Sequence, residues 1–189
     1  VELEFKSIEA MNGFFKGKIG PKTLPKMKGV VKNFSAFTAM LLTLLKLSDL
    51  TGATQPPKDE ETKTLMVKCF FYLLSSGISQ LNKMGHTEIK DWTSKSPDRV
   101  YSFAVDGHPE VAAYIRIKAG KSRAGRGEYK RAMPFFTLRF NNLDSALGIL
   151  LSIDDMLEAT KAGRLIMDGG PEFGAQHGGF MLEVGDLAK

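Results

Sequence analysis

The sequence predicts an α+β protein: a small, mostly antiparallel sheet of about five strands covered by helices, preceded by an apolar helical extension. Two observations predict this class. Apolar residues recur with a helical period up to residue 95, and with the period of two that is typical of strands from residue 100 onward. Because the pattern changes once, we divide the chain into a helical extension, residues 1–95, and an α+β domain, residues 96–189.

The extension is expected to begin with a short helix, Glu2–Phe15, followed by a basic linker and an apolar helix, Phe34–Leu47. The segment from Phe34 to Leu45 carries no charge. It is too short to span a bilayer, which needs about twenty residues. Gly52 and the pair Pro56-Pro57 are expected to end this helix and turn the chain.

A second apolar helix is predicted to follow, with Asp59, Glu60 and Glu61 at its N-terminus, where the helix dipole stabilises negative charge. Its apolar stripe extends from Leu65 to Leu81. Two helices this apolar cannot both lie on the surface of a monomer. We expect them to pack on the following domain, on a second copy of the chain or on lipid, and we predict a homo-oligomer.

Three runs in the second half alternate apolar and polar residues: VYSFAV at 100–105, VAAYIRIK at 111–118 and MPFFTLRF at 133–140. This alternation predicts three antiparallel strands joined by hairpins. The segment Lys118–Arg131, between the second and third runs, is basic and contains glycine, and we expect it to be a loop.

After the sheet, short helices and one more strand are predicted. Asn142 can cap a first helix, and Ser152 with Asp155 has the spacing of a capping box for a second helix, which Gly163 ends. RLIMD at 164–168 is expected to form a buried strand. A final helix begins near Pro171. One face of this helix carries Phe173, His177, Phe180, Met181, Val184 and Leu187.

The net charge is +5 and the pI is near 9.2, and the excess is concentrated in two places. Six lysines within Lys16–Lys32 have no acid among them, and Lys118–Arg131 holds six basic residues against Glu128. Such clusters suit the phosphate of a membrane or of nucleic acid, although two solvated loops would also explain them. We predict a peripheral contact with an anionic membrane through Lys16–Lys32. Nucleic acid is disfavoured because the second cluster contains a single aromatic residue, Tyr129.

The sequence offers little catalytic chemistry. The stretch KAGRLIMDGGPEFG (161–174) lies between a predicted strand and a helix, as phosphate-binding loops do, but Asp168 places a carboxylate at the turn and Pro171 lacks an amide proton. We therefore interpret its glycines as chain reversals. Asp106, His108 and Glu110 fit a hairpin turn better than a metal site. We predict no catalytic residues, no enzymatic activity, no metal and no cofactor.

The single cysteine, Cys69, cannot form an intramolecular disulfide, which is typical of a protein in a reducing compartment. It lies in an apolar stretch, and we expect it to be a small core residue rather than a nucleophile. On this basis a cytoplasmic location is predicted.

Residues 98–188 resemble the sterol carrier protein (type two) lipid-transfer family in the order of their elements. The matching pieces are TLRFNNLDSALGILLSIDDMLEATKAGRLIMDGGPEFG and GGFMLEVGDL, and the family's strand Gly-Lys-Ile-x-Ile-x-Gly is matched by Gly163–Gly169. The resemblance covers about half of the chain. The family's separate third strand is expected within Gly127–Phe140, and the helix Glu60–Met84 is a candidate for the family's opening helix.

The resemblance implies non-catalytic binding or carrying of a lipid or other apolar ligand, fatty acyl or sterol-like, in an internal hydrophobic cavity. A wall of methionine and phenylalanine suits such a ligand, although it is also ordinary core. The alternatives are a structural or oligomerisation module without a ligand, and a basic nucleic-acid-binding protein. The residues expected to line the cavity are Phe136, Leu138, Leu147, Leu150, Leu157, Leu165, Met167, Phe180, Met181 and Val184.

Overall fold

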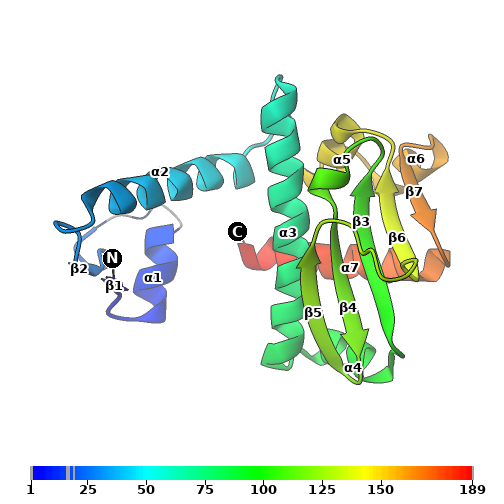
Figure 1. Cartoon of the computed structure of the whole chain (residues 1–189), viewed down its shortest axis with the longest axis horizontal. Helices are drawn as coiled ribbons and strands as arrows, with labels where there is room; N and C mark the ends of the chain where they lie inside the picture. The colour runs from blue at the N-terminus through cyan, green and yellow to red at the C-terminus, as the bar shows by residue number, and fades with distance from the viewer. Residues whose placement is uncertain (1, 16–17, 19, 189) are drawn as a thin grey trace. The chain divides into compact units, whose positions relative to one another are not determined.

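The computed structural model describes residues 2–15, 18 and 20–188. The chain divides into two compact units, Val1–Ala53 and Thr54–Ala188 (Figure 1). This division lies well before residue 95, because the helix that follows it packs on the sheet of the second unit. Each unit is described below on its own.

The first unit pairs two short strands and contains two helices. Strand β1 (Glu2–Glu4) is antiparallel to β2 (Lys26–Lys28), α1 spans Ile8–Phe15, and α2 spans Phe34–Thr51. The helix expected from Glu2 therefore begins six residues later. Residues 2–4 pair with β2 instead, and the Ser7 hydroxyl accepts a hydrogen bond from the Ala10 amide at 3.2 Å, which caps the first turn of α1.

The second unit opens with its longest helix, α3 (Glu60–Met84). The predicted acidic N-terminus is confirmed: Asp59 is the cap and its side chain accepts from the Thr62 amide at 2.8 Å, while Gly85 ends the helix with a φ of 84°. The helix is long and apolar enough to cross a membrane by composition, but one face of it is buried against the sheet. The Phe71 ring lies 5.5 Å from Phe103 and 6.1 Å from Phe140.

The sheet has the order β5-β4-β3-β6-β7. Its strands are β3 (Arg99–Val105), β4 (Ala113–Lys118), β5 (Lys121–Arg126), β6 (Phe136–Phe140) and β7 (Leu165–Asp168), and a short 3-10 turn, η1 (Pro109–Val111), links β3 to β4. The prediction of an α+β fold with about five strands is confirmed. The sheet is mixed, because β3 and β6 are parallel and the other pairs are antiparallel.

Two sequence predictions about the strands were wrong. Strand β6 does not form a hairpin with β4, because β5 occupies that edge and residues 127–135 return the chain to the free edge of β3. The predicted basic loop is in large part β5 itself, and the segment Gly127–Phe140 contributes β6 alone among the described strands. A two-residue turn, Ala119-Gly120, joins β4 to β5, and both residues have positive φ, 49° and 71°, as a type I′ hairpin requires.

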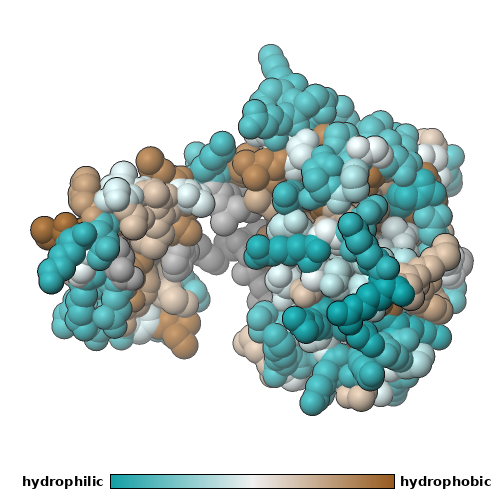
Figure 2. Space-filling view, viewed as in Figure 1, coloured by the Kyte–Doolittle hydropathy of each residue, from teal (hydrophilic) through white to brown (hydrophobic). Residues whose placement is uncertain are grey.

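The two faces of the sheet differ in polarity. One face is covered by helices and consists of large apolar side chains: Tyr101, Phe103, Ile115, Ile117, Phe136, Leu138 and Phe140. On the other face Arg116 donates to Asp98 at 2.8 Å, and Arg139 bridges Asp106 on one side and Asp168 on the other. In Figure 2 hydrophilic side chains gather over this outer face. The alternation in β3, β4 and β6 therefore places the core between sheet and helices.

After β6 come α5 (Leu143–Leu150), α6 (Met156–Lys161) and β7. The cap at Asn142 is confirmed, since its side chain accepts from the Ser145 amide at 2.8 Å. The capping box at the next helix was misassigned. Asp155 is itself the N-cap and accepts from the Glu158 amide at 3.0 Å, whereas Ser152 lies in the turn with a φ of 58°.

The glycine-rich stretch reverses the chain twice, as predicted. Gly163 ends α6 with a φ of 68°. Gly169 has a φ of 128°, and a Cβ there would lie 3.0 Å from the Phe135 carbonyl oxygen, so no other residue fits without strain. The last helix, α7 (Pro171–Ala188), then crosses behind the strands (Figure 1).

Candidate functional site

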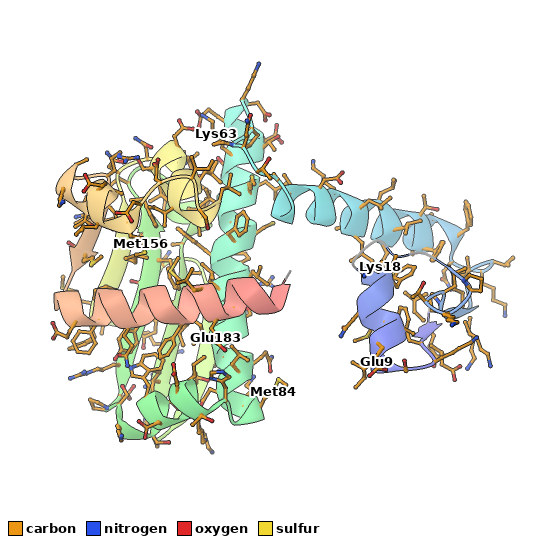
Figure 3. The ribbon with its side chains drawn as sticks, turned by 180° about the vertical axis from the view of Figure 1, so that it is seen from behind. Glu9, Lys18, Lys63, Met84, Met156 and Glu183 are labelled. Carbon is orange, nitrogen blue, oxygen red and sulfur yellow. The ribbon has the colours of Figure 1, made fainter. Side chains whose placement is uncertain are left out.

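A surface cavity of about 710 Å³ lies between α7 and α4 (Thr87–Lys95), beside the first residues of β3. Figure 3 shows α7 from behind, with Glu183 on the side of the helix that faces α4. We name this cavity the α4–α7 groove. Its lining consists of Glu88, Asp91, Trp92, Lys95, Ser96, Pro97, Arg99, Tyr101, Phe173, Gln176, Gly179, Phe180 and Glu183.

The floor of the groove is aromatic. The ring of Trp92 lies 5.0 Å from Tyr101 and 5.0 Å from Phe180, and Phe173 lies 6.3 Å from Tyr101. Trp92 belongs to the buried face of α4, together with Ile89 and Thr93. Tyr101 belongs to the helix-covered face of β3. Tilted and edge-to-face packing of this kind holds the rings in fixed positions.

One end of the groove is acidic. Glu183 Oε1 lies 2.9 Å from His86 Nε2, a contact that ties α7 to the residue before α4. The other ring nitrogen, His86 Nδ1, is buried and has no hydrogen-bond partner among the described residues. Along α4, the Lys95 ammonium pairs with Asp91 at 2.7 Å, and Glu88 lies in the first turn, where the helix dipole stabilises its charge.

The other end of the groove carries Arg99. The guanidinium carbon lies 3.7 Å from the centroid of the Phe135 ring and 5.5 Å from that of Phe173. These two rings pack edge to face at 4.9 Å. The arginine is therefore held on an aromatic platform by cation–π attraction. The groove thus has an apolar floor with acidic groups at one end and a cation at the other.

The predicted cavity residues lie mostly in the core. Phe136, Leu138, Leu147, Leu165, Phe180 and Val184 are buried, and Leu150, Met167 and Met181 are half-buried. Phe180 is the member of this set that lines the α4–α7 groove. Leu157 is 62% exposed, so it lies at the surface instead of in a cavity. The reason is that α6 buries Ala159, and residues two positions apart lie on nearly opposite sides of a helix.

Glycines of the helices pack against two of the predicted residues. A Cβ at Gly77 of α3 would lie 2.6 Å from Val184 Cγ1, and a Cβ at Gly174 would lie 2.2 Å from Met167 Sδ. Val184 and Met167 therefore occupy the space that the missing side chains leave. Close contact of this kind brings α7 near both α3 and β7. A role of these residues in ligand binding stays a prediction.

The sequence prediction missed Trp92, Arg99 and Tyr101 as groove residues. A signal for Trp92 was present, because Ile89, Trp92 and Thr93 have the i, i+3, i+4 spacing of a helix face that packs on a neighbour. Phe173 and Phe180 were predicted to share one face of the last helix; Phe180 is buried, Phe173 is half-buried, and both line the groove. Two further members of that face, His177 and Leu187, lie outside the side chains that the structure describes.

The three residues considered for a metal site, Asp106, His108 and Glu110, do not form one cluster. Asp106 accepts from Arg139 at 2.9 Å, whereas His108 Nδ1 lies 3.0 Å from Glu110 Oε1. No three metal-ligating side chains gather within the part of the chain that the structure describes. Burial raises the pKa of the Cys69 thiol, which disfavours the thiolate needed for nucleophilic attack.

The second unit is thus an α+β domain that presents a groove between two helices packed on its sheet. No family model matches the chain, and no curated protein matches it. Among solved structures the chain is similar in fold to sterol carrier protein 2, with 17% identity, 63% of this chain and 95% of that protein covered, and a TM-score of 0.39. It is likewise similar to a conserved hypothetical protein of Thermus thermophilus, described as a candidate sterol carrier protein (18% identity, 61% of this chain, 85% of that chain, TM-score 0.39). A ubiquinone synthesis protein, UbiJ-SCP2, also resembles it (18% identity, 62% of this chain, 96% of that chain, TM-score 0.38). The likeness is one of fold.

Proposed function

We propose that the second unit binds a lipid or another elongated apolar molecule in the α4–α7 groove and carries it without chemical change. The observation that carries the proposal is the aromatic floor formed by Trp92, Tyr101, Phe173 and Phe180 within a cavity of about 710 Å³. Small-molecule sites have volumes of roughly 300–1,000 Å³ and combine apolar walls with a few polar groups.

The energetics are adequate for such a ligand. An acyl chain that buries about 400 Å² of apolar surface gains about 10 kcal/mol before other contributions are counted. Ordering of the chain and loss of translational freedom reduce this to an affinity in the micromolar range. A carrier must also release its ligand, so affinity of this order suits the proposed function.

Gly179 offers a direct test. It lines the groove, and a Cβ at this position would meet no atom within 4 Å, so a side chain can begin there without a clash and a large one is expected to occupy the groove. Gly179→Trp should abolish uptake of a fluorescent fatty acid by delipidated protein and leave the melting temperature unchanged or raised, since glycine is a poor helix former. Delipidation matters because a bound lipid raises apparent stability.

The matched control is Gly185→Trp. Gly185 lies on the same helix, also has open space around its Cβ position, and is not part of the groove lining. This variant should bind the probe as the unchanged protein does. Equal uptake by both variants would contradict binding in the groove, and loss of uptake in both would show that the tryptophan perturbs α7 as a whole.

We also propose that the first unit associates with a second copy through α2. The observation in favour is the exposure of large apolar side chains on this helix, with Phe34 at 67%, Leu42 at 61% and Leu45 at 51%. Exposed apolar surface of this kind typically marks an interaction site. Sedimentation should show a dimer or larger species that Leu42→Glu dissociates. A monomer at micromolar concentration without detergent would contradict self-association.

A further inference from the structure

We infer that Arg99 binds the anionic head group, carboxylate or phosphate, of an acyl lipid whose chain lies on the aromatic floor of the α4–α7 groove. The inference rests on the proposed function and adds to it the class of head group and the direction in which the ligand lies.

Arg99 is a cation with no counter-ion in the part of the chain that the structure describes. Among the described residues no carboxylate pairs with it, and its neighbours are the rings of Phe135 and Phe173, at 3.7 and 5.5 Å. Two arginines of the outer sheet face, Arg116 and Arg139, differ in this respect, because Arg116 pairs with Asp98 and Arg139 pairs with both Asp106 and Asp168. Arg99 is half-buried and borders the groove, so an anion in the groove can supply the missing partner.

The aromatic platform prepares Arg99 for this role. A guanidinium that lies over a ring uses its face for the cation–π contact and keeps the in-plane N–H donors at its edge available. Those donors form a fixed fork that matches two oxygens of a carboxylate or a phosphate. Because the side chain is already held by Phe135, binding an anion requires little further ordering.

The charges of the groove favour one direction for the ligand. Glu183 lies ten positions after Phe173 on α7, which corresponds to roughly 15 Å along the helix. The Glu183 carboxylate would repel an anion at that end, and Lys95 is already paired with Asp91. An anionic head group is therefore expected at Arg99, with its chain extending past Phe180 and Trp92 toward Glu183.

Three fluorescent probes test the inference on delipidated full-length protein: a labelled stearic acid, its methyl ester and the matching lysophosphatidic acid. Arg99→Met keeps an apolar stem on Phe135 and removes the charge. It should weaken binding of at least one anionic probe by about tenfold or more, the usual effect of losing a charge-assisted hydrogen bond, and leave ester binding unchanged. The control Arg123→Met removes the same charge from the exposed side of β5 and should change neither. The anion that loses more affinity identifies the head group.

The outcomes separate the head-group inference from the proposed function. If the unchanged protein binds none of the three probes, the proposed function fails. If it binds acid and ester equally and Arg99→Met changes neither, ligand binding stands and the role of Arg99 is overturned. If Arg99→Met removes ester binding as well, Arg99 supports the aromatic packing of the groove and not the head group, which also overturns the inference.

Discussion

The two long apolar helices of this protein, α2 and α3, differ in how much of their surface is buried. Helix α2 carries two charged residues among its 18, Lys46 and Asp49, whereas α3 carries five among its 25. The helix with fewer charges is nevertheless the exposed one. No side chain that the structure describes on α2 is buried, while nine residues of α3 are buried.

The difference shows that the burial of a helix depends less on its apolar content than on whether the rest of the fold offers a complementary surface to pack against. Helix α3 has such a surface. Its apolar face meets the sheet, and its buried polar residues are also matched: the Asn82 amide donates to Ser122 Oγ at 2.8 Å, and the Thr93 hydroxyl donates to Asn82 Oδ1 at 2.7 Å. Buried polar groups that are fully hydrogen-bonded fix one arrangement of the helix. No comparable pattern is present among the described contacts of α2.

The largest effect is expected from Phe71→Ala in α3. Phe71 is fully buried and packs on Phe103 and Phe140, so its removal should lower the free energy of unfolding by about 3–5 kcal/mol. The matched change in α2, Leu42→Ala, should alter it by less than about 0.5 kcal/mol because Leu42 is 61% exposed. Urea unfolding followed by far-ultraviolet circular dichroism, which reports on the helices of both units, measures both changes.

The comparison would break if Leu42→Ala cost more than about 1 kcal/mol, since a surface position rarely does so. That result would mean that Leu42 is covered in solution. Repeating the measurement at several protein concentrations tells whether a second copy provides the cover, because the stability of a dimer depends on concentration.

A smaller effect with a change of sign is expected at Gly77 of α3. Gly77→Ala would place its Cβ 2.6 Å from Val184 Cγ1, and overpacking of this kind costs about 1–3 kcal/mol. In a Val184→Ala background the clash is removed. There the same change should stabilise the protein by up to about 1 kcal/mol, because alanine is the better helix former.

The four proteins of this double-mutant cycle are compared by urea unfolding. A coupling free energy near zero would show that α3 and α7 are not in contact at these positions, since distant sites add independently. The packing of Val184 against Gly77 could then no longer explain how α3, unlike α2, is held in place.

Local signals in the sequence predicted most of the second unit. Asn142 was identified as a cap because a side-chain oxygen before an apolar run satisfies the first amides of a helix. The N-terminus of α3 was identified by its acids, Asp59 to Glu61, which the helix dipole stabilises. Strands β3 and β4 were identified by alternation. Strand β5 was missed because KSRAGR contains no apolar alternation. It is an edge strand whose outward side chains are charged, which is how edge strands avoid pairing with other chains.

The parallel pairing of β3 with β6 and the α4–α7 groove could not be predicted from local pattern. Both depend on which segments meet in space: residues 127–135 select the edge of β3, and the groove combines α4, α7 and the start of β3. Arg99 precedes the alternating run at 100–105, and its sequence context gives no sign of the Phe135 and Phe173 rings that hold it. The first unit shows the same dependence on tertiary structure. The sequence analysis treated the lysines of Lys16–Lys32 as unpaired, because local pattern does not show that β1 pairs with β2.

The smallest effects are expected for membrane contact of the first unit. Strand pairing places Glu2 and Glu4 of β1 opposite Lys28 and Lys26 of β2, and Lys28 lies 3.4 Å from Glu4. The basic run is therefore partly neutralised. Each uncompensated lysine near an anionic surface contributes about 1 kcal/mol. Lys22→Gln with Lys32→Gln should weaken flotation with phosphatidylserine vesicles, whereas Glu2→Gln with Glu4→Gln should strengthen it, and high salt should abolish the difference between them. Equal binding of all variants to neutral phosphatidylcholine vesicles would contradict an electrostatic contact. That result would assign membrane binding to the exposed apolar side chains of α2. The bilayer would then cover α2 as the sheet covers α3.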